Sequence, residues 1–277
     1  MSERTVPLTV AVAGATGWAG SALVRGIVRE PDLALVAGVA RRAAGRGVGE
    51  ALGVDCAAPI VGTAAEALAL HPDVFVEYSR PEAALGHVLA ALQAGAHVVV
   101  GTSGLSDDDY ARIDAAARAA GRGVLAAGNF AITAVLLQKF AEIAVRWLPD
   151  VELLDYAKAG KIDVPSGTVR ELANRLGAAR GDARASAPAA DAVRGPRETR
   201  GASMSGIPVH ALRVPGFVLG VEVVFGAADQ RLHLRHEAGG SAEPYVAGAL
   251  LAIREVPALT GLVRGLDRVM DFAGSGR

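Results

Sequence analysis

The stretch Leu8-Thr-Val-Ala-Val-Ala-Gly14-Ala-Thr-Gly17-Trp-Ala-Gly20, near the start of the chain, decides the fold. Its first half, Leu8 to Ala13, is a short apolar run rich in valine, which is typical of a strand buried on both faces. Three glycines follow at once, and the spacing of Leu23, Val24 and Ile27 then indicates a helix. The stretch therefore predicts a buried strand, a tight turn and a helix, the first unit of an α/β fold.

The three glycines have separate roles in such a turn. The first allows the tight turn, the second lets the backbone approach a pyrophosphate, and the third lets the helix pack on the strand. The helix N-terminus stabilises negative charge. A dinucleotide is therefore expected here, bound by Gly14, Thr16, Gly17, Trp18, Ala19 and Gly20; the alternative is a tight turn that binds nothing.

Outward from this stretch, strand and helix patterns alternate through the first half of the chain. Strands are expected at 33–39, 73–78, 98–100 and 124–127. Pro81 is placed to open a helix that runs to about Ala94, and Ser106 is placed to cap another that runs to about Ala120. This order predicts a doubly wound parallel sheet of the Rossmann-like kind.

The pattern changes after Asn129. A long amphipathic helix is expected at 132–148, then strands at 151–156, 209–214, 217–225 and 232–236, mostly with no helix between them. These features predict a smaller α+β domain with an antiparallel or mixed sheet. Residues 178–206 are expected to form a mobile surface loop, and the chain from Tyr245 is expected to be helical again. The predicted domains are 1–130 with 241–277 for the dinucleotide, and 131–240 for substrate binding and oligomerisation.

Composition excludes several classes of protein. In 277 residues, 51% are hydrophobic and 21% charged, which supports a packed core. Lys+Arg is 28 and Asp+Glu is 29, so no general attraction to nucleic acid or membrane is expected. One cysteine, Cys56, excludes an internal disulfide and a cysteine-based zinc site. No secretory signal or membrane span is found, and a cytoplasmic protein is expected.

The histidines give no metal site. His233 and His236 are three residues apart on an expected strand, which places them on opposite faces. We therefore expect no metal.

The end of the second expected strand bears on the choice of cofactor. NAD-binding folds commonly place an acid there for the ribose hydroxyls, whereas this chain has Arg41 and Arg42. Either arginine can pair with the 2′-phosphate of NADP through fork-like hydrogen bonds. NADPH is therefore the preferred cofactor, with NADH as a second possibility; the alternative is two solvated arginines.

A second anion site is expected at Lys161-Ile-Asp-Val-Pro-Ser166-Gly167-Thr168, which precedes a helical pattern. Ser166 is placed to cap the helix, the amides of Gly167 and Thr168 point outward, and Lys161 adds a full charge. A substrate carboxylate fits this arrangement. The alternative is a capped helix with no ligand.

With these motifs the chain resembles the dihydrodipicolinate reductase family, the NAD(P)H-dependent enzymes of bacterial lysine biosynthesis. The resemblance covers nearly the whole length, and its most specific part is the match of 161–168 to the family signature K-x-D-x-P-S-G-T. The glycine loop is also similar, as are three further segments: Ser79-Arg80-Pro81, Gly101-Thr102-Ser103-Gly104 and Gly128-Asn129-Phe130.

The resemblance implies roles for these residues. Lys161 and the Gly167 and Thr168 amides would bind substrate carboxylates, with Ser166 beside them. The residues implied to border the nicotinamide are Ser79, Arg80, Gly101, Thr102, Ser103, Gly128, Asn129 and Phe130. The family is typically a homotetramer built through the sheet of the substrate domain.

One departure concerns the proton. The family has a histidine pair four and three residues before the lysine, and the first histidine is its proposed proton donor. This chain has Ala157 and Lys158 there. Alanine cannot donate a proton, which leaves Lys158, Lys161 or water.

Taken with these motifs, the resemblance implies an NAD(P)H-dependent reductase of a C=N bond in a small cyclic carboxylated substrate, similar to the 4-hydroxy-tetrahydrodipicolinate reductases. A related reductase of another cyclic imino acid and a non-catalytic NADPH-binding protein remain as alternatives.

Overall fold

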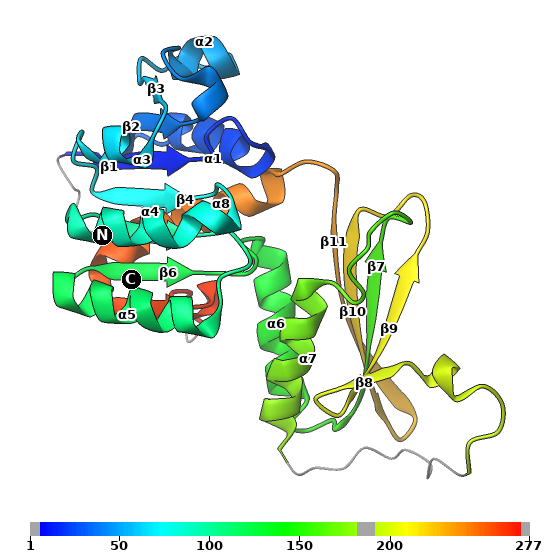
Figure 1. The fold of residues 1–277 in the computed structure, drawn as a ribbon. Coiled ribbons are helices and arrows are strands. Elements are labelled where there is room, and N and C mark those ends of the chain that lie inside the picture. Colours follow the sequence, from blue (N-terminus) through cyan, green and yellow to red (C-terminus); the bar gives the residue numbers. More distant parts are fainter. Residues whose placement is uncertain (1–5, 182–191, 273–277) are drawn as a thin grey trace. The chain divides into compact units, whose positions relative to one another are not determined.

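The computed structural model describes residues 6–181 and 192–272, and the chain divides into two compact units (Figure 1). The first unit is Met1–Ile132 with Ala242–Arg277, and the second is Thr133–Ser241.

The first unit is built on a seven-stranded sheet whose paired strands are all parallel. In spatial order the strands are β12 (Gly261–Arg264), β6 (Gly123–Ala126), β5 (His97–Val100), β4 (Val74–Glu77), β1 (Leu8–Ala13), β2 (Leu33–Val39) and β3 (Ile60–Val61). The valine and alanine side chains of the central strands are fully buried. This is the predicted doubly wound parallel fold.

Helices cover both faces of this sheet (Figure 1). On one face, α3 (Ala64–Leu68), α4 (Pro81–Gln93) and α5 (Asp107–Ala120) share a single core with the strands. The helix α1 (Trp18–Arg29) packs instead against α8 (Val246–Glu255). A short helix, α2 (Val48–Leu52), precedes β3. Pro81 opens α4 and Ser106 caps α5, as the sequence predicts.

The second unit is a five-stranded mixed sheet with helices on one face. The strand order is β11 (Gln230–Ala238), β10 (Leu219–Ala227), β7 (Asp150–Ala157), β9 (Ile207–Arg213) and β8 (Ala202–Met204). Only the β7–β9 pair is parallel among these described strands. The helices α6 (Ile132–Ala144) and α7 (Gly167–Arg180) bury their apolar sides against the sheet.

Three expectations about local structure are wrong. The first helix of the second unit ends at Ala144 and not at Leu148, since residues 145–147 form a turn. The C-terminal segment is not helical throughout, because Pro257 and Gly261 follow α8 and the chain then adds β12 to the sheet edge. The segment 178–206 is not wholly a loop, since α7 reaches Arg180 and β8 begins at Ala202; residues 182–191 of it lie outside the described residues.

Candidate active site

The glycine-rich turn after β1 depends on close backbone packing. Gly14 has a φ of +78°, and a Cβ there would lie 2.2 Å from the Tyr78 carbonyl oxygen. A Cβ on Gly20 would lie 2.1 Å from the Gly14 carbonyl oxygen. The turn closes with the Gly17 amide donating to that oxygen at 2.8 Å. Side chains at positions 14 and 20 would therefore displace the turn from the first strand and helix.

A cavity of about 670 Å³ lies beside this turn, at the carboxyl ends of the first strands of the sheet. Three arginines line it, Arg41, Arg42 and Arg80, together with His87, and its described lining contains no acid. The hydroxyl-bearing side chains of the lining are Thr16, Thr63, Tyr78 and Ser79. Basic groups next to a helix N-terminus suit the phosphates of a dinucleotide.

A second cavity of about 340 Å³ adjoins the carboxyl ends of β4, β5 and β6. Its aromatic side chains form two pairs: Trp18 with Tyr245, whose ring centroids are 5.7 Å apart, and Tyr78 with Phe130, at 5.9 Å. Backbone-rich segments complete it, at 101–103 and 127–129. Flat apolar walls with nearby backbone polar groups suit a planar ring that carries an amide, such as a nicotinamide.

The structure brings together nearly all the predicted cofactor residues. Thr16, Gly17, Arg41 and Arg42 line the larger cavity; Trp18, Ala19 and the segments 101–103 and 128–130 line the smaller one. Gly20 lines neither, because it packs against Gly14. Arg80, predicted to border the nicotinamide, lines the larger, basic cavity.

Three residues of this region were missed by sequence reasoning. Tyr245 comes from the far end of the chain, at the end of a 3₁₀ turn over Glu243–Tyr245. His87 lies in the second turn of α4, and Glu77 ends β4. Their positions in the printed sequence carry no motif, although an acid at the end of an otherwise apolar strand is a signal that could have pointed to Glu77.

Glu77 is the centre of a buried polar network. Its side chain is fully buried, and its Oε1 accepts hydrogen bonds from the Ser79 amide at 2.8 Å and from the Ser79 hydroxyl. Thr102 Oγ1 donates to the same oxygen at 3.2 Å, and His87 Nδ1 lies 2.7 Å from Oε2. Buried carboxylates require such partners.

In the second unit, the predicted anion motif forms a turn and a helix start. Ser166 caps α7, as predicted, with its hydroxyl accepting from the Val169 amide at 3.4 Å. Gly167 is exposed at the first turn of the helix. The Lys161 ammonium lies 2.7 Å from Asp163 Oδ1, and about a quarter of the lysine side chain is exposed. This pairing lowers the pKa of Asp163, chiefly through the lysine hydrogen bond.

Asp155 and Arg213 fix the conformation of this turn, and neither was predicted from the sequence as a site residue. The buried Asp155 carboxylate accepts from the Ser166 amide at 2.7 Å and from the Ser166 hydroxyl at 2.8 Å. Arg213 Nη2 donates to Asp155 Oδ2 at 2.6 Å and to the Asp163 carbonyl at 3.0 Å. The inward direction of Asp155 follows from strand alternation, but its partners are distant in sequence.

The two residues at the family's histidine positions differ in exposure. Ala157 is fully buried at the end of β7, and Lys158 is exposed just beyond it. Tyr156 points to the other face of the sheet, where its hydroxyl donates to Glu222 Oε2 at 2.8 Å. Of these three side chains only that of Lys158 is exposed, and its carbonyl oxygen accepts from the Lys161 amide at 3.0 Å.

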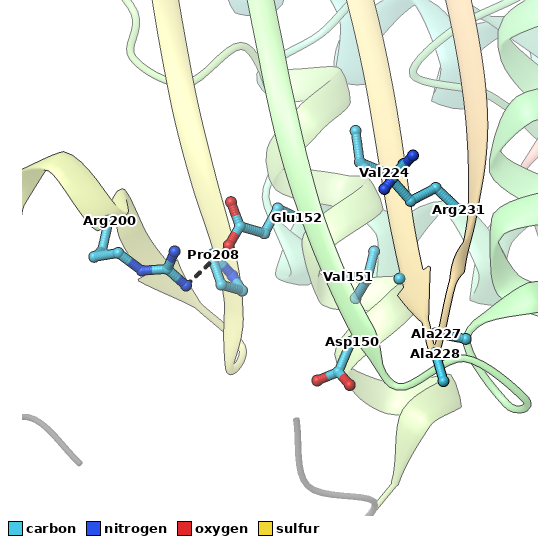
Figure 2. A pocket seen from close by; sticks show the side chains of 10 residues that line it. Asp150, Val151, Glu152, Arg200, Pro208, Val224, Ala227, Ala228 and Arg231 are labelled. Carbon is cyan, nitrogen blue, oxygen red and sulfur yellow. Dashed lines mark hydrogen bonds and ion pairs between the residues drawn. The ribbon is translucent and has the colours of Figure 1, made fainter. Parts of the chain in front are cut away.

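A third cavity lies on the sheet of the second unit, and no residue of the 161–168 turn lines it. Figure 2 shows its lining, in which Arg200 Nη2 pairs with Glu152 Oε1 at 3.1 Å. Among the described residues we find no cluster of side chains suited to a metal ion. No described helix is long and apolar enough to cross a membrane.

The parallel sheet, its glycine turn and the two adjoining cavities define a dinucleotide-binding oxidoreductase fold. Two family models match the chain: dihydrodipicolinate reductase, N-terminus, over residues 8–130, and dihydrodipicolinate reductase, C-terminus, over 133–270. The chain belongs to the dihydrodipicolinate reductase family.

Relatives with established names support this membership over the full length. The chain is 39% identical over 268 residues to 4-hydroxy-tetrahydrodipicolinate reductase of Streptomyces coelicolor, covering 96% of this chain and 98% of the relative. It is 34% identical over 267 residues to the same enzyme of Moorella thermoacetica, with the same coverage. A dipicolinate-bound dihydrodipicolinate reductase from Paenisporosarcina sp. TG-14 superposes with a TM-score of 0.84 at 28% identity, covering 96% of this chain and 100% of that one.

Proposed function

We propose that the protein is an NADPH-dependent 4-hydroxy-tetrahydrodipicolinate reductase, which reduces a C=N bond in a small cyclic dicarboxylate. The observation that carries the proposal is the coexistence of two separate places suited to an anion. One is the basic cavity beside the glycine turn, and the other is the capped helix start with Lys161. The relatives' names and the dipicolinate held by a similar enzyme support the same substrate class.

The first unit is proposed to hold the cofactor. The glycine turn would receive the pyrophosphate, and the walls around Gly101 and Phe130 would receive the nicotinamide, which supplies hydride when bound. The Tyr78 hydroxyl is buried without a hydrogen-bond partner among the described residues, and Gly101 packs closely against the Tyr78 ring. Together they form a wall of the cavity proposed for the nicotinamide, which supports this fit.

NADPH is proposed as the preferred form. Arg41 and Arg42 are both exposed in the short 3₁₀ turn that follows β2, and Arg80 lines the same cavity. No acid of the described lining would repel a 2′-phosphate. Arginine can pair with a phosphate through two hydrogen bonds at once. We propose Arg41 as the main partner, with Arg42 beside it in the same turn.

The second unit is proposed to hold the substrate. Its carboxylates would sit on the Lys161 ammonium and on the amides of Gly167 and Thr168, while Ser166 fixes the turn through its bonds to Asp155. For a substrate carboxylate to reach Lys161, it must compete with Asp163. Catalysis of proton transfer to the product nitrogen is assigned to Lys161 or Lys158, with water as the remaining donor, because Ala157 has no proton to give.

A second candidate function is reduction of a different cyclic imino acid. The observation that favours it is the pair Ala157 and Lys158 in place of the family's histidines. Oxidation of NADPH should therefore be followed with freshly generated 4-hydroxy-tetrahydrodipicolinate and, in parallel, with a panel of cyclic imino acids. Turnover only on the first substrate supports the main proposal, and turnover only on another supports the second. Tight NADPH binding with no turnover on any would indicate a non-catalytic binding protein.

The protein is further proposed to be a cytoplasmic homotetramer, assembled through the helix-free face of the second unit's sheet. That face carries the exposed Leu212 and the half-buried Leu154 and Val224, beside charged pairs such as Glu222 with Arg235. The cavity of Figure 2 lies on the same face. Analytical ultracentrifugation at micromolar concentration tests this, since a monomer would contradict it.

A further inference from the structure

We propose that Glu77 is a positioning residue that holds both halves of the cofactor site in register. The inference rests on the proposed function, because it presumes that the two cavities of the first unit receive one dinucleotide. Glu77 itself lines neither cavity, so it would act through the side chains that it orders.

The hydrogen-bond partners of Glu77 are distributed over both cavities. His87 lines only the larger, basic cavity, Thr102 lines only the smaller one, and Ser79 lines both. Each of the three bonds to the same buried carboxylate. One side chain therefore fixes one wall residue of each cavity and Ser79, one of the two residues that the cavities share.

The two oxygens of the Glu77 carboxylate have different partners. Oε1 accepts from the Ser79 amide, the Ser79 hydroxyl and Thr102 Oγ1, while Oε2 faces His87 Nδ1. An ionised carboxylate has only acceptor sites, so Nδ1 of a neutral His87 ring carries the proton and Nε2 is left as an acceptor. Thr102 Oγ1 also lies 3.1 Å from the Glu77 carbonyl oxygen, which ties the loop after β5 to the end of β4.

An amide in place of the Glu77 carboxylate would change these hydrogen bonds. In Glu77→Gln one oxygen becomes an NH₂ group, which can only donate. If that group faces His87, the ring must present Nδ1 as an acceptor and move its proton to Nε2. If it faces Ser79 and Thr102 instead, it meets donors. Either arrangement disturbs at least one cavity wall, although the side chain keeps its shape.

Dissociation constants for two ligands distinguish effects on the larger cavity from effects on the smaller one. Titrations with NADPH, and with 2′,5′-ADP as a probe of the larger cavity alone, should be run on the full chain. Glu77→Gln is expected to weaken NADPH binding roughly tenfold, in line with the loss of a hydrogen bond to a charged group. His87→Leu should weaken both ligands, whereas Thr102→Val should weaken NADPH and leave 2′,5′-ADP unchanged.

Glu82→Gln is the matched control, since Glu82 is an exposed acid in the first turn of α4. It should bind both ligands as the parent protein does. Thermal unfolding without ligand shows whether each variant is folded, and the His87 and Thr102 variants carry the test if Glu77→Gln fails to fold.

The inference is overturned if folded Glu77→Gln binds NADPH with the parent's dissociation constant and only melts earlier, which would mark a purely structural carboxylate. It is also overturned if Thr102→Val and His87→Leu leave both affinities unchanged. Failure of the parent protein to bind NADPH at all would instead contradict the proposed function.

Discussion

Lys161 Nζ and Asp163 Oδ1 are 2.7 Å apart at the start of the turn that leads into α7. The lysine that is proposed to receive a substrate carboxylate is therefore already paired with a carboxylate of its own turn. The pairing lowers the pKa of Asp163, chiefly through the hydrogen bond from Lys161, so the acid stays charged as the pH falls from neutral. A bound anion must displace this contact or share the ammonium with it.

Asp163→Asn is expected to improve substrate binding. The amide keeps the shape of the side chain but removes the negative charge that competes for Lys161. Because both side chains are partly exposed, the pair is screened by solvent, and we expect KM to fall only about two- to fivefold. Steady-state kinetics on the active imine measure it, with Asp108→Asn on α5 as an exposed control. A rise in KM would show that Asp163 orients Lys161 and does not compete with the substrate.

Arg213→Met should destabilise the second unit more than the loss of a surface pair does. It leaves the fully buried Asp155 carboxylate with only the two Ser166 donors. Breaking one side of a buried ion pair costs about 3–5 kcal/mol in free energy of unfolding. Urea denaturation of Arg213→Met and of Arg200→Gln, which breaks an exposed pair with Glu152, gives the comparison. Equal losses in the two variants would contradict the anchoring role of Arg213.

Arg41→Ser is expected to reduce the preference for NADPH. Loss of one charge-assisted pair with the 2′-phosphate is worth about 1.5–3 kcal/mol, or roughly ten- to a hundredfold in dissociation constant. NADH, which lacks that phosphate, should bind the variant almost as it binds the parent. Fluorescence titration with both cofactors measures this, and Arg42→Ser tests the neighbouring residue. Parent affinities that are equal for NADPH and NADH would refute the preference.

The buried His236 should make the second unit sensitive to acid. Its Nδ1 lies 2.9 Å from Thr133 Oγ1, and burial lowers the pKa of the ring below the ordinary value of a histidine. The unfolded chain therefore binds a proton at a higher pH than the folded one, so stability falls as the pH drops below about 6.5. His236→Gln should flatten that part of the curve of unfolding free energy against pH. An unchanged slope in His236→Gln would contradict the assignment.

The sequence predicted the fold where local signals are strong. Leu8–Ala13 is apolar except for Thr9 and is followed at once by a glycine-rich turn, and Ser106 and Ser166 begin helices with the caps that their hydroxyls suggest. Strand β12 was missed because its four residues follow a helix and are held by partners distant in sequence, through pairing with β6 and contacts with α5. Such edge strands have no periodicity of their own to read.

The site was predictable as motifs but not as networks. The residues around Gly14, Gly101 and Gly128 could be named because each motif lies on contiguous residues. The buried groups beneath them could not: Asp155 meets Arg213 across 58 positions, and Glu77 meets Thr102 across 25. Contacts of this kind arise only when the sheet brings distant strand ends together.

Lys161 is the charged part of the proposed substrate site, and the proposed reaction depends on it more than on any other residue. Lys161→Ala keeps the Gly167 and Thr168 amides but removes the ammonium. We expect a loss of about 2–4 kcal/mol in transition-state stabilisation, or roughly thirty- to a thousandfold in kcat/KM. NADPH affinity should hardly change, and Lys161→Arg should restore KM better than kcat if the lysine also delivers the proton.

Steady-state kinetics of Lys161→Ala and Lys161→Arg on the imine that proves active, with NADPH saturating, test this claim most directly. We expect a large loss of kcat/KM in the alanine variant and partial recovery, chiefly in KM, in the arginine variant. Near-normal kcat and KM in both would contradict it, and would leave the Ser166-Gly167-Thr168 turn as a helix cap with no ligand.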